Sequence, residues 1–323
     1  MSRPLFVSVV VCTRNRSEVL KESSAALWRM DYPPDRWEVL IVDNHSSDDT
    51  LTVARDIASM HPGRVQVIEE RELGISVSRN AGIQRARGEV IAFLDDDSFP
   101  EPGWLSALVE VLTREPEALV VGGPVEPWFA GELPSWFGER FHVYVTAWDK
   151  GPEVRKLTYN DYPRGANMAF RREVFARFGN FNAHLGYKGT GLMACDETEL
   201  CLRVERSGGR ILYVPRARVR HLTAASRITP AWLARRFQGQ AHSEAILEWR
   251  HSGWLGLYRG WRQFARNARA TVRQRHRSAE DKILARCTGR ALLGYTLGLL
   301  RAPLTIRRYR PPVGTAEWLS PLA

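Results

Sequence analysis

The chain has 323 residues, 44% of them hydrophobic, with 11 Trp, 9 Tyr and 12 Phe, so it can bury a sizeable core as one large domain with an extension or as two domains. Its four cysteines lack the CxxC spacing of zinc sites, which leaves reduced thiols of a cytosolic protein as the expectation. The first residues lack the basic, apolar and small-residue pattern of a signal peptide, and we therefore expect a cytoplasmic protein.

The positive charge of the chain is concentrated in its last third. The net charge is +10, yet residues 226–323 contain 18 Lys and Arg against 5 Asp and Glu, whereas residues 1–225 contain 28 against 31. This asymmetry predicts two functional parts, residues 1–225 and residues 226–323. It also predicts a polyanionic neighbour for the second part.

Apolar runs alternate with helical patterns through the first part of the chain. The runs are rich in Val, Ile and Leu, and each is short enough for a strand buried on both faces. Helices are expected between them, one of them beginning at Ser17. Such alternation predicts an α/β protein with a parallel sheet and covered faces. The predicted strands are residues 5–11, 37–42, 65–68, 90–94 and 119–123.

Polar residues follow several of these strands. Residues 13–16 follow the first strand, Asp43 ends the second, and three aspartates, residues 95–97, follow the fourth. Parallel strands bring their carboxyl ends to one edge, so we expect these residues to converge. Hard carboxylate oxygens suit Mg²⁺ or Mn²⁺ completed by substrate phosphates. The alternative for residues 95–97 is a solvated acidic loop. The alternative for Asp43 is a helix cap, a role for which Ser46 and Asp48 compete.

Four motifs in this order carry a family resemblance: CTRNR, IVDNHSSDDT, LGISVSRNAGI and VIAFLDDD. Together they resemble a family 2 inverting glycosyltransferase over residues 5–225. The resemblance implies the GT-A nucleotide-diphospho-sugar transferase fold, which has a Rossmann-like and mostly parallel sheet. Residues 226–323 would then be a basic helical extension.

The resemblance also implies residues that hold the nucleotide of the donor. Thr13 and Arg16 lie in the loop around the nucleotide, and Asp43 should accept a hydrogen bond from the base. Gly74 and Arg79 lie in the segment that closes over it. A surface or capping arginine is the other interpretation of Arg79.

The metal would be held at the end of the fourth strand. The resemblance implies that Asp97 binds a divalent metal, Mg²⁺ or Mn²⁺, that bridges the diphosphate. Asp95 should touch the ribose or the metal, and Asp96, the middle residue, should have a secondary role in donor binding. His221 follows a predicted strand at residues 210–215, and in proteins that the chain resembles a histidine at this place is often a further metal ligand. The alternative is a core or surface histidine.

Two middle segments are candidates for the sugar and acceptor. Asn167 lies in a strand that resembles the one lining the donor-sugar pocket, with an ordinary core strand as the alternative. Residues 126–163 are rich in Trp, Tyr, Pro and Gly without clear periodicity, and long irregular segments are often functional. Its aromatic residues would contact the acceptor or pack in the core.

An inverting transfer needs one base for the acceptor hydroxyl. Asp196, Glu197 and Glu199 lie in the first turn of a predicted helix, where the helix dipole favours ionised acids. The family's usual base aligns with Glu197, where aspartate is more common. Asp196 is the alternative base.

The extension begins with a helix start at Thr229-Pro230. In a second helix, Leu257, Trp261, Phe264 and Ala268 share one face, and Arg259, Arg262, Arg266, Arg269 and Arg273 lie opposite. The apolar run 291–300 is too short to span a bilayer. We expect peripheral attachment to an anionic inner membrane surface, with this run in the interface; the alternative is a helix packed on the core with a solvated basic side. No nucleic acid is expected, since no such module appears.

These observations predict a metal-dependent inverting glycosyltransferase. It would move a sugar from a nucleotide-diphosphate donor to a hydroxyl of a polysaccharide, a lipid-linked glycan or a small molecule. A sugar-phosphate nucleotidyltransferase would carry a glycine-rich loop after the first strand, and residues 13–16 contain no glycine. A non-catalytic peripheral membrane-binding protein would leave the acids unexplained. These motifs do not specify the identity of the sugar, the nucleotide base or the acceptor, nor the oligomeric state.

Overall fold

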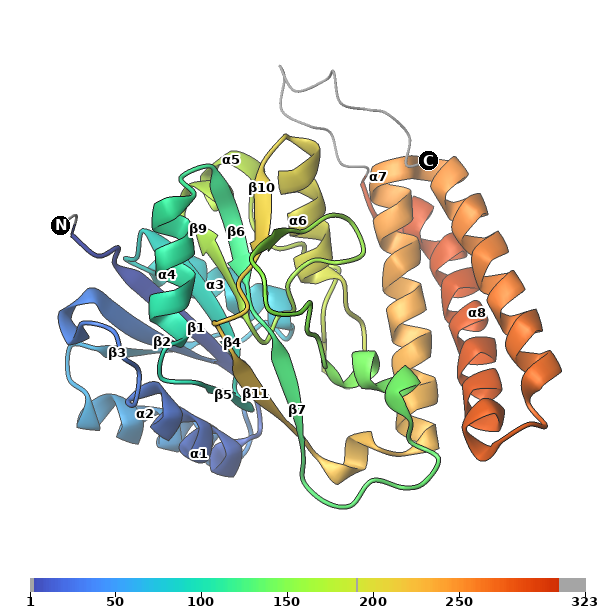
Figure 1. Cartoon of the computed structure of the whole chain (residues 1–323), viewed down its shortest axis with the longest axis horizontal. Coiled ribbons are helices and arrows are strands. Elements are labelled where there is room, and N and C mark those ends of the chain that lie inside the picture. Colours follow the sequence, from blue (N-terminus) through green and yellow to red (C-terminus); the bar gives the residue numbers. More distant parts are fainter. Residues whose placement is uncertain (1–2, 190, 308–323) are drawn as a thin grey trace. The chain divides into compact units, whose positions relative to one another are not determined.

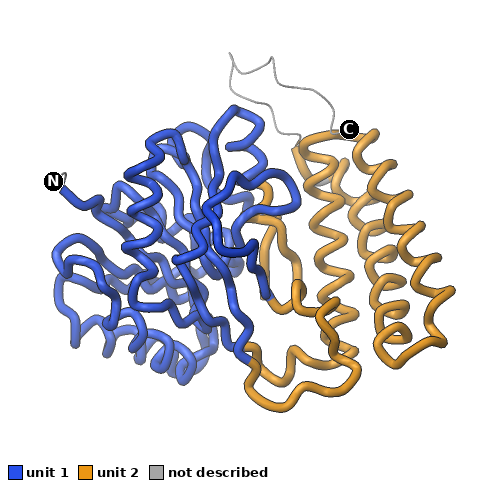
Figure 2. Tube along the Cα trace, viewed as in Figure 1, with its two compact units in different colours: residues 1–128, 146–183, 200–222 blue, residues 129–145, 184–199, 223–323 orange. Residues whose placement is uncertain are grey.

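The structure is a computed structural model that describes residues 3–189 and 191–307. The chain forms two compact units, coloured separately in Figure 2. Unit 1 contains residues 1–128, 146–183 and 200–222, and unit 2 contains residues 129–145, 184–199 and 223–323. The predicted domain boundary at residue 225 stays a prediction.

Unit 1 is built on an eight-stranded, mostly parallel sheet with the strand order β3-β2-β1-β4-β9-β6-β10-β8. Strand β9 is antiparallel to both β4 and β6, and β8 is antiparallel to β10. The α/β fold predicted from the alternating pattern is therefore confirmed. The strands are β1 (Val7–Thr13), β2 (Trp37–Asp43), β3 (Val65–Glu69), β4 (Val90–Asp95), β6 (Ala118–Gly122), β8 (Arg155–Lys156), β9 (Met168–Arg171) and β10 (Arg210–Tyr213).

The central strands form because their side chains are apolar and helices cover the sheet. Every residue of β2 is buried, as are the first five of β4, which is typical of a parallel strand with both faces packed. Helix α3 packs on β1 and β2, and α4 packs on β6. Figure 1 shows these helices against the strands of unit 1. The helices of this unit are α1 (Ser17–Leu27), α2 (Thr50–Met60), α3 (Ile75–Arg85), α4 (Trp104–Arg114), α5 (Glu173–Phe178) and, from Leu200 on, α6 (Asp196–Arg206), with the short η1 (Pro34–Arg36).

The register of the central strands brings their polar ends level. Thr13 at the end of β1 pairs with Asp43 at the end of β2, and Cys12 pairs with Asp95 at the end of β4. The convergence expected from three distant segments is thus present at one edge of the sheet.

A second, three-stranded sheet has the order β5-β11-β7. Its strands are β5 (Ser98–Pro100), β11 (Val219–Thr223) and β7 (Val125–Phe129). Strand β11 is antiparallel to β5, with His221 opposite Ser98. Because Ser98 follows the three aspartates directly, this pairing carries His221 to the end of β4.

Aromatic residues of the irregular segment 126–163 are mostly packed. Trp148 is buried against Tyr213, with ring centroids 5.2 Å apart. Trp136 packs against Phe137 and Phe141, the latter in η2 (Glu139–Val145) of unit 2. Trp128 is partly exposed, and the guanidinium of Arg220 lies over its ring. Core packing therefore accounts for much of this segment, and acceptor contact stays a prediction.

Unit 2 is dominated by two long helical stretches, α7 (Pro230–Gln274) and α8 (Ala279–Thr305), after the short η3 (Ala225–Arg227). The predicted start of α7 is confirmed, because the Thr229 hydroxyl accepts a hydrogen bond from the Trp232 N–H. Gly253 has φ 65° and ψ −148° and divides α7 into two helices, as the sequence pattern predicted. A positive φ of this kind favours glycine.

The helices of unit 2 pack side by side through glycines and shared hydrogen bonds. A Cβ at Gly294 of α8 would lie 2.1 Å from the Gln238 carbonyl oxygen, and one at Gly260 would lie 2.1 Å from the Tyr295 hydroxyl. Both parts of α7 thus touch α8. The apolar run 291–300 contributes to this packing, since Ala291 and Tyr295 are buried. Within the described residues, no helix is both long enough and apolar enough to cross a membrane.

Candidate functional site

Two aspartates and a histidine meet at the end of β4. His221 Nε2 lies 3.0 Å from an oxygen of Asp97 and 3.9 Å from an oxygen of Asp95. One ligand atom from each of the three residues lies within 4.8 Å of the others. The backbone holds the group together, because the Leu222 N–H donates to the Asp97 carbonyl oxygen. These are the three residues predicted to hold the metal.

The donor set fits a divalent ion. Two carboxylates and an imidazole supply the oxygen and nitrogen ligands that Mn²⁺ accepts, and the carboxylates also suit Mg²⁺. Asp97 and His221 are buried, whereas Asp95 is partly exposed. A buried carboxylate is stable only when paired or bound to a cation. The arrangement could therefore hold a divalent ion, and Asp95 is the partly exposed member of the group.

Arg16 supplies positive charge to the same carboxylates. Its Nη1 donates to Asp96 Oδ1 at 3.1 Å and to Asp97 Oδ2 at 2.5 Å, while the Thr13 hydroxyl donates to Asp96 Oδ2 at 2.8 Å. Burial alone would lower the pKa of Arg16, but the charges of Asp96 and Asp97 raise it. Burial raises the pKa of Asp96 to about 6, against the attraction of Arg16. Asp96 thus joins the end of β4 to the loop after β1.

The loop after β2 leaves one oxygen of Asp43 available. Asp48, not Asp43, accepts from both the N–H and the hydroxyl of Thr50 at the start of α2. Asp43 Oδ2 accepts from the Ser46 N–H at 3.2 Å. Asp43 Oδ1 is buried and has no hydrogen-bond partner among the described residues. A buried acceptor without a partner is costly, so this atom is suited to a donor on a ligand.

Asn44 organises the neighbouring segment. Its Oδ1 accepts from the Gly74 N–H at 2.8 Å, and its Nδ2 donates to the carbonyl oxygens of Glu70 and Glu72. Gly74 has φ 143°, a conformation that favours glycine. Our sequence reasoning missed Asn44; its position directly after Asp43 at a strand end was the signal available.

Arg79 is not a surface residue. It projects from α3 and is 5% exposed, with its guanidinium near the rings of Phe93 and Phe181. Its Nη2 lies 3.4 Å from Asp95 Oδ1. A Cβ at Gly165 would overlap this guanidinium, so Gly165 makes room for it. Arg79 therefore adds a cation beside Asp95.

Asn167 lies inside the core of unit 1. It is fully buried; its Oδ1 accepts from Trp104 Nε1, and its Nδ2 donates to the carbonyl oxygens of Pro124 and Ala217. The amide satisfies backbone groups inside unit 1, and the side chain has no surface for a sugar. These contacts favour the core-strand alternative for Asn167, and its role in donor binding stays a prediction.

The predicted catalytic acids lie at the start of α6, in unit 2. Asp196 and Glu199 are buried, and Glu197 is half-buried. Glu199 Oε1 accepts from Arg250 Nε at 2.7 Å and lies 3.1 Å from His251 Nε2. Glu199 thus attaches the start of α6 to α7, and Glu197 has the most accessible side chain of the three acids.

The segment before these acids is also held by α7. The Ala194 N–H donates to the Ser243 hydroxyl at 2.9 Å, and Gln240 Nε2 donates to Cys195 Sγ at 3.2 Å. Gly239 allows the close approach, because a Cβ there would lie 2.2 Å from the Leu192 carbonyl oxygen. Burial raises the pKa of the Cys195 thiol, which keeps this cysteine neutral.

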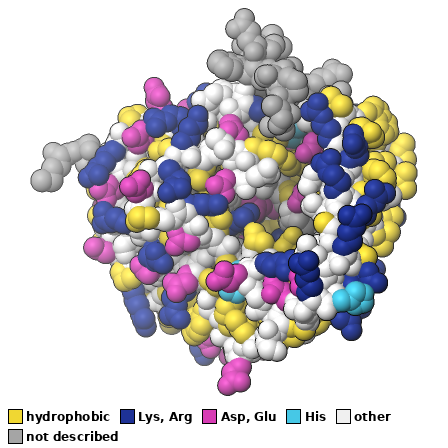
Figure 3. Space-filling model, turned by 45° about the vertical axis from the view of Figure 1, so that its right-hand side comes forward, with side chains coloured by type: hydrophobic (Ala, Val, Ile, Leu, Met, Phe, Trp, Pro, Cys, Tyr) yellow, Lys and Arg dark blue, Asp and Glu magenta, His cyan; other side chains and the backbone are white. Residues whose placement is uncertain are grey.

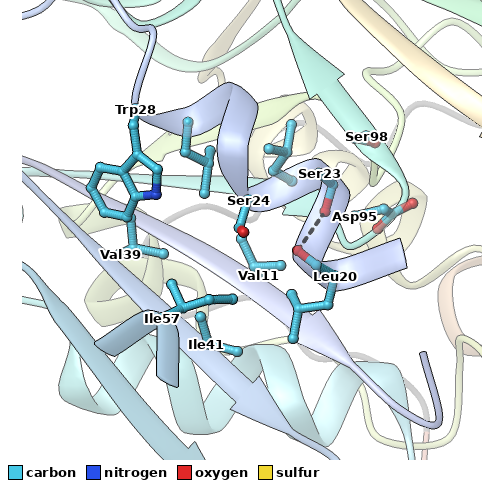
Figure 4. Close-up of a pocket in the computed structure, with 12 residues that line it drawn as sticks. Val11, Leu20, Ser23, Ser24, Trp28, Val39, Ile41, Ile57, Asp95 and Ser98 are labelled. Carbon is cyan, nitrogen blue, oxygen red and sulfur yellow. Dashed lines mark hydrogen bonds between the residues drawn. The ribbon is translucent and has the colours of Figure 1, made fainter. Parts of the chain in front are cut away.

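Figure 4 shows a small cavity behind Asp95, lined by side chains of α1, β1 and β2 that include Val11, Leu20 and Ile41. Its volume is about 10 Å³, and a cavity of this size holds one water at most. It is a packing gap of the core and is too small for a nucleotide.

The sequence model described as "Glycosyl transferase family 2" matches residues 8–179. The chain belongs to glycosyl transferase family 2. It is 32% identical over 246 residues to a glucosyl-dolichyl phosphate glucuronosyltransferase of Haloferax volcanii, covering 75% of this chain and 77% of that one. It is 30% identical over 262 residues to the succinoglycan biosynthesis protein ExoM of Rhizobium meliloti, covering 80% and 79%. The family 2 chain is thus a glycosyltransferase, and the nucleotidyltransferase and non-catalytic alternatives fall away.

Solved structures share the fold of this family 2 enzyme. The mannosyltransferase PcManGT of Pyrobaculum calidifontis, in complex with GDP-Man and Mn²⁺, matches with a TM-score of 0.61 and 20% identity, covering 93% of this chain and 88% of that chain. GalNAc-T7 with UDP, GalNAc and Mn²⁺ matches with a TM-score of 0.59 and 16% identity, covering 84% and 51%. These likenesses confirm the predicted GT-A fold.

Proposed function

We propose that this glycosyltransferase is metal-dependent and inverts the configuration of the sugar that it transfers. The observation that carries the proposal is the meeting of Asp95, Asp97 and His221 at the carboxyl edge of the sheet, with their ligand atoms within 4.8 Å of one another. This is the edge at which open α/β sheets bind ligands. Both structural neighbours were solved with Mn²⁺, which supports the choice of ion.

The nucleotide-diphosphate sugar is proposed to bind along the loops at this edge. Asp43 Oδ1 accepts a hydrogen bond from the base, and the segment from Gly74 to Arg79 borders the nucleotide. Thr13 and Arg16 line the same loop, where the register places Thr13 opposite Asp43. A divalent metal held by Asp95, Asp97 and His221 would neutralise the negative charge that develops on the departing diphosphate.

Glu197 is proposed as the catalytic base, with Asp196 as the alternative. The acceptor hydroxyl gives its proton to the carboxylate of Glu197 as its oxygen attacks the anomeric carbon. The bond from that carbon to the diphosphate oxygen breaks, and the electron pair leaves with the nucleoside diphosphate. The half-buried state of Glu197 supports this choice, because a base must reach its substrate, whereas Asp196 is buried.

A lipid-linked glycan is the acceptor class that the relatives favour. The relative from Haloferax volcanii is named a glucosyl-dolichyl phosphate glucuronosyltransferase, and a relative from Rhizobium johnstonii is named a dodecaprenyl-phosphate galacturonate synthase. ExoM is named for succinoglycan biosynthesis, which keeps cell-envelope polysaccharide as an acceptor class. We propose that the reaction takes place on the cytoplasmic side, where nucleotide sugars are available. The division into residues 1–225 for the donor and residues 226–323 as an extension belongs to the same proposal.

Calorimetric titration with Mn²⁺ and with UDP or GDP tests the site. We expect nucleoside diphosphate to bind at least tenfold more tightly with Mn²⁺ than with EDTA. Asp97→Asn should remove this difference, because one carboxylate ligand becomes a neutral amide. Asp35→Asn, which changes an exposed acid in η1, is the matched control. Equal binding of both nucleotides with and without Mn²⁺ would contradict metal dependence.

A further inference from the structure

The helix that follows Gly253 exposes a cluster of large apolar side chains. Trp254 is 64% exposed, Leu255 54% and Tyr258 56%, and Trp261 in the next turn is 38% exposed. Trp254, Tyr258 and Trp261 are spaced four and three residues apart, so they share one side of the helix. Exposed aromatic residues grouped in this way mark an interaction surface.

A row of arginines borders this cluster. At 100° per residue, the arginine side chains fall on the face next to the aromatic residues, away from the buried Leu257. The guanidinium of Arg262 lies over the ring of Tyr258, with its carbon 5.6 Å from the ring centroid. The arginines are Arg259, Arg262, Arg266, Arg269 and Arg273, all exposed.

The neighbouring helix α8 adds further apolar surface. It lies beside the second part of α7, since the Tyr295 hydroxyl donates to the Leu257 carbonyl oxygen and Thr271 and Thr288 share a hydrogen bond. Leu293, Leu300 and Leu304 are exposed, the last of them to 85%. Figure 3 shows hydrophobic side chains gathered at the upper right of the view, with Lys and Arg side chains beside them.

We propose that this face binds the surface of an anionic lipid bilayer. We call it the Trp254 face and define it as the five arginines together with Trp254, Leu255, Tyr258 and Trp261. Indole and phenol rings partition into the interface between lipid headgroups and acyl chains. The arginines, next to the rings, would lie at the level of acidic headgroups.

Charge decides between a bilayer and a second copy of this chain. A symmetric dimer through the Trp254 face would bring the same patch of two molecules together, and thus five arginines against five. Like charges facing each other in an interface are unfavourable. A bilayer with acidic headgroups presents the opposite sign and is the complementary partner.

The run 291–300 presents only part of its surface outward. Ala291, Gly294, Tyr295 and Gly298 face the other helices of unit 2, whereas Leu293 and Leu300 are exposed. The apolar side chains that point outward come mainly from the helix after Gly253. This proposal is independent of the proposed transfer reaction, since none of these residues belongs to the donor site or carries the base.

Flotation of the full chain with liposomes tests the proposal. Vesicles of phosphatidylcholine alone are compared with vesicles that also contain phosphatidylglycerol, and we expect at least tenfold stronger partitioning to the latter at low salt. The double change Trp254→Ser and Tyr258→Ser should weaken this partitioning at least tenfold. The double change Arg262→Gln and Arg266→Gln should remove most of the preference for phosphatidylglycerol. Met60→Ser, at a site 65% exposed in unit 1, is the matched control and should change nothing.

A second measurement does not depend on the variants. Lipids brominated near the headgroup should quench part of the tryptophan fluorescence of the unchanged protein, because Trp254 and Trp261 would enter the interface. Equal partitioning to both kinds of vesicle, or partitioning that survives the Trp254 and Tyr258 changes, would overturn the proposal. Light scattering gives a further test. A dimer that the same two changes dissociate would also overturn the proposal, since the face would then join two copies of the chain.

Discussion

Arg16 is the counter-charge of two buried aspartates, and replacing it should reveal this role. Its Nη1 contacts both Asp96 and Asp97, whose side chains are 10% and 4% exposed. Arg16→Met keeps much of the aliphatic length and removes the charge. The aspartates then lose their nearest guanidinium while they remain out of water.

The size of the effect follows from burial. Removing one partner of a fully buried ion pair costs about 3–5 kcal/mol. The side chain of Arg16 is 26% exposed, so water screens part of the interaction. We therefore expect a loss of about 2–3 kcal/mol in the free energy of unfolding of unit 1, and a fall in its melting temperature of about 4–12 °C.

Scanning calorimetry in EDTA and in Mn²⁺ measures both parts of the prediction. Mn²⁺ should raise the melting temperature of Arg16→Met more than that of the unchanged protein, because the ion replaces the lost positive charge and no longer competes with Arg16 for Asp97. Arg55→Met is the control, since Arg55 pairs with Glu69 at 2.5 Å and both side chains are more than half exposed; it should change the unfolding free energy by less than about 1 kcal/mol.

Two results would refute this reasoning. One is an Arg16→Met protein that melts in EDTA within about a degree of the unchanged protein. The other is an equal shift of both proteins by Mn²⁺. Either result would mean that Arg16 is not the counter-charge of these carboxylates.

Three further predictions concern the acids and their support in unit 2. Glu197→Gln should lower sugar transfer at least about 100-fold while leaving the affinity for nucleotide unchanged, because general-base catalysis contributes about 10²–10⁴; full turnover would move the base elsewhere. Gly239→Ala should lower the free energy of unfolding, measured in urea, by about 1–3 kcal/mol, since its Cβ would overlap the Leu192 carbonyl oxygen. The control Gly289→Ala, with open space around the new Cβ, should be neutral or slightly stabilising. Similar losses at both glycines would contradict the close contact. Glu199→Gln removes the carboxylate that pairs with Arg250 and His251 and should lower the free energy of unfolding by about 3–5 kcal/mol. Glu132→Gln, which changes an exposed acid, is the control and should produce no measurable change. Unchanged unfolding of Glu199→Gln would mean that the cluster does not support α6.

Local patterns were enough for the strands and for the edge where the site lies. Apolar runs with polar ends predicted β1, β2 and β4, and a parallel sheet must bring such ends together. The positions of Thr13, Asp43 and Asp95 at that edge follow directly. The division of α7 was likewise predicted from two separate amphipathic patterns, although the part played by Gly253 was not.

Other features depend on residues distant in sequence. Asn167 lies in a segment that resembles a donor-binding strand, but its amide is used inside the core, and only the packed structure shows this. The attachment of Glu199 to Arg250 and His251 joins the acid motif to the basic extension, which the charge pattern had separated. Such contacts come from packing, and no local pattern encodes them.

By itself, the sequence determined the main strands and helices, the edge of the sheet that carries the chemistry and, through four motifs, the family. The tertiary structure decided which charges neutralise one another, which acid is accessible and which outer face of the helices remains uncovered. The reason is physical: periodicity and strand direction are properties of neighbouring residues, whereas burial and charge pairing arise only when distant segments pack together.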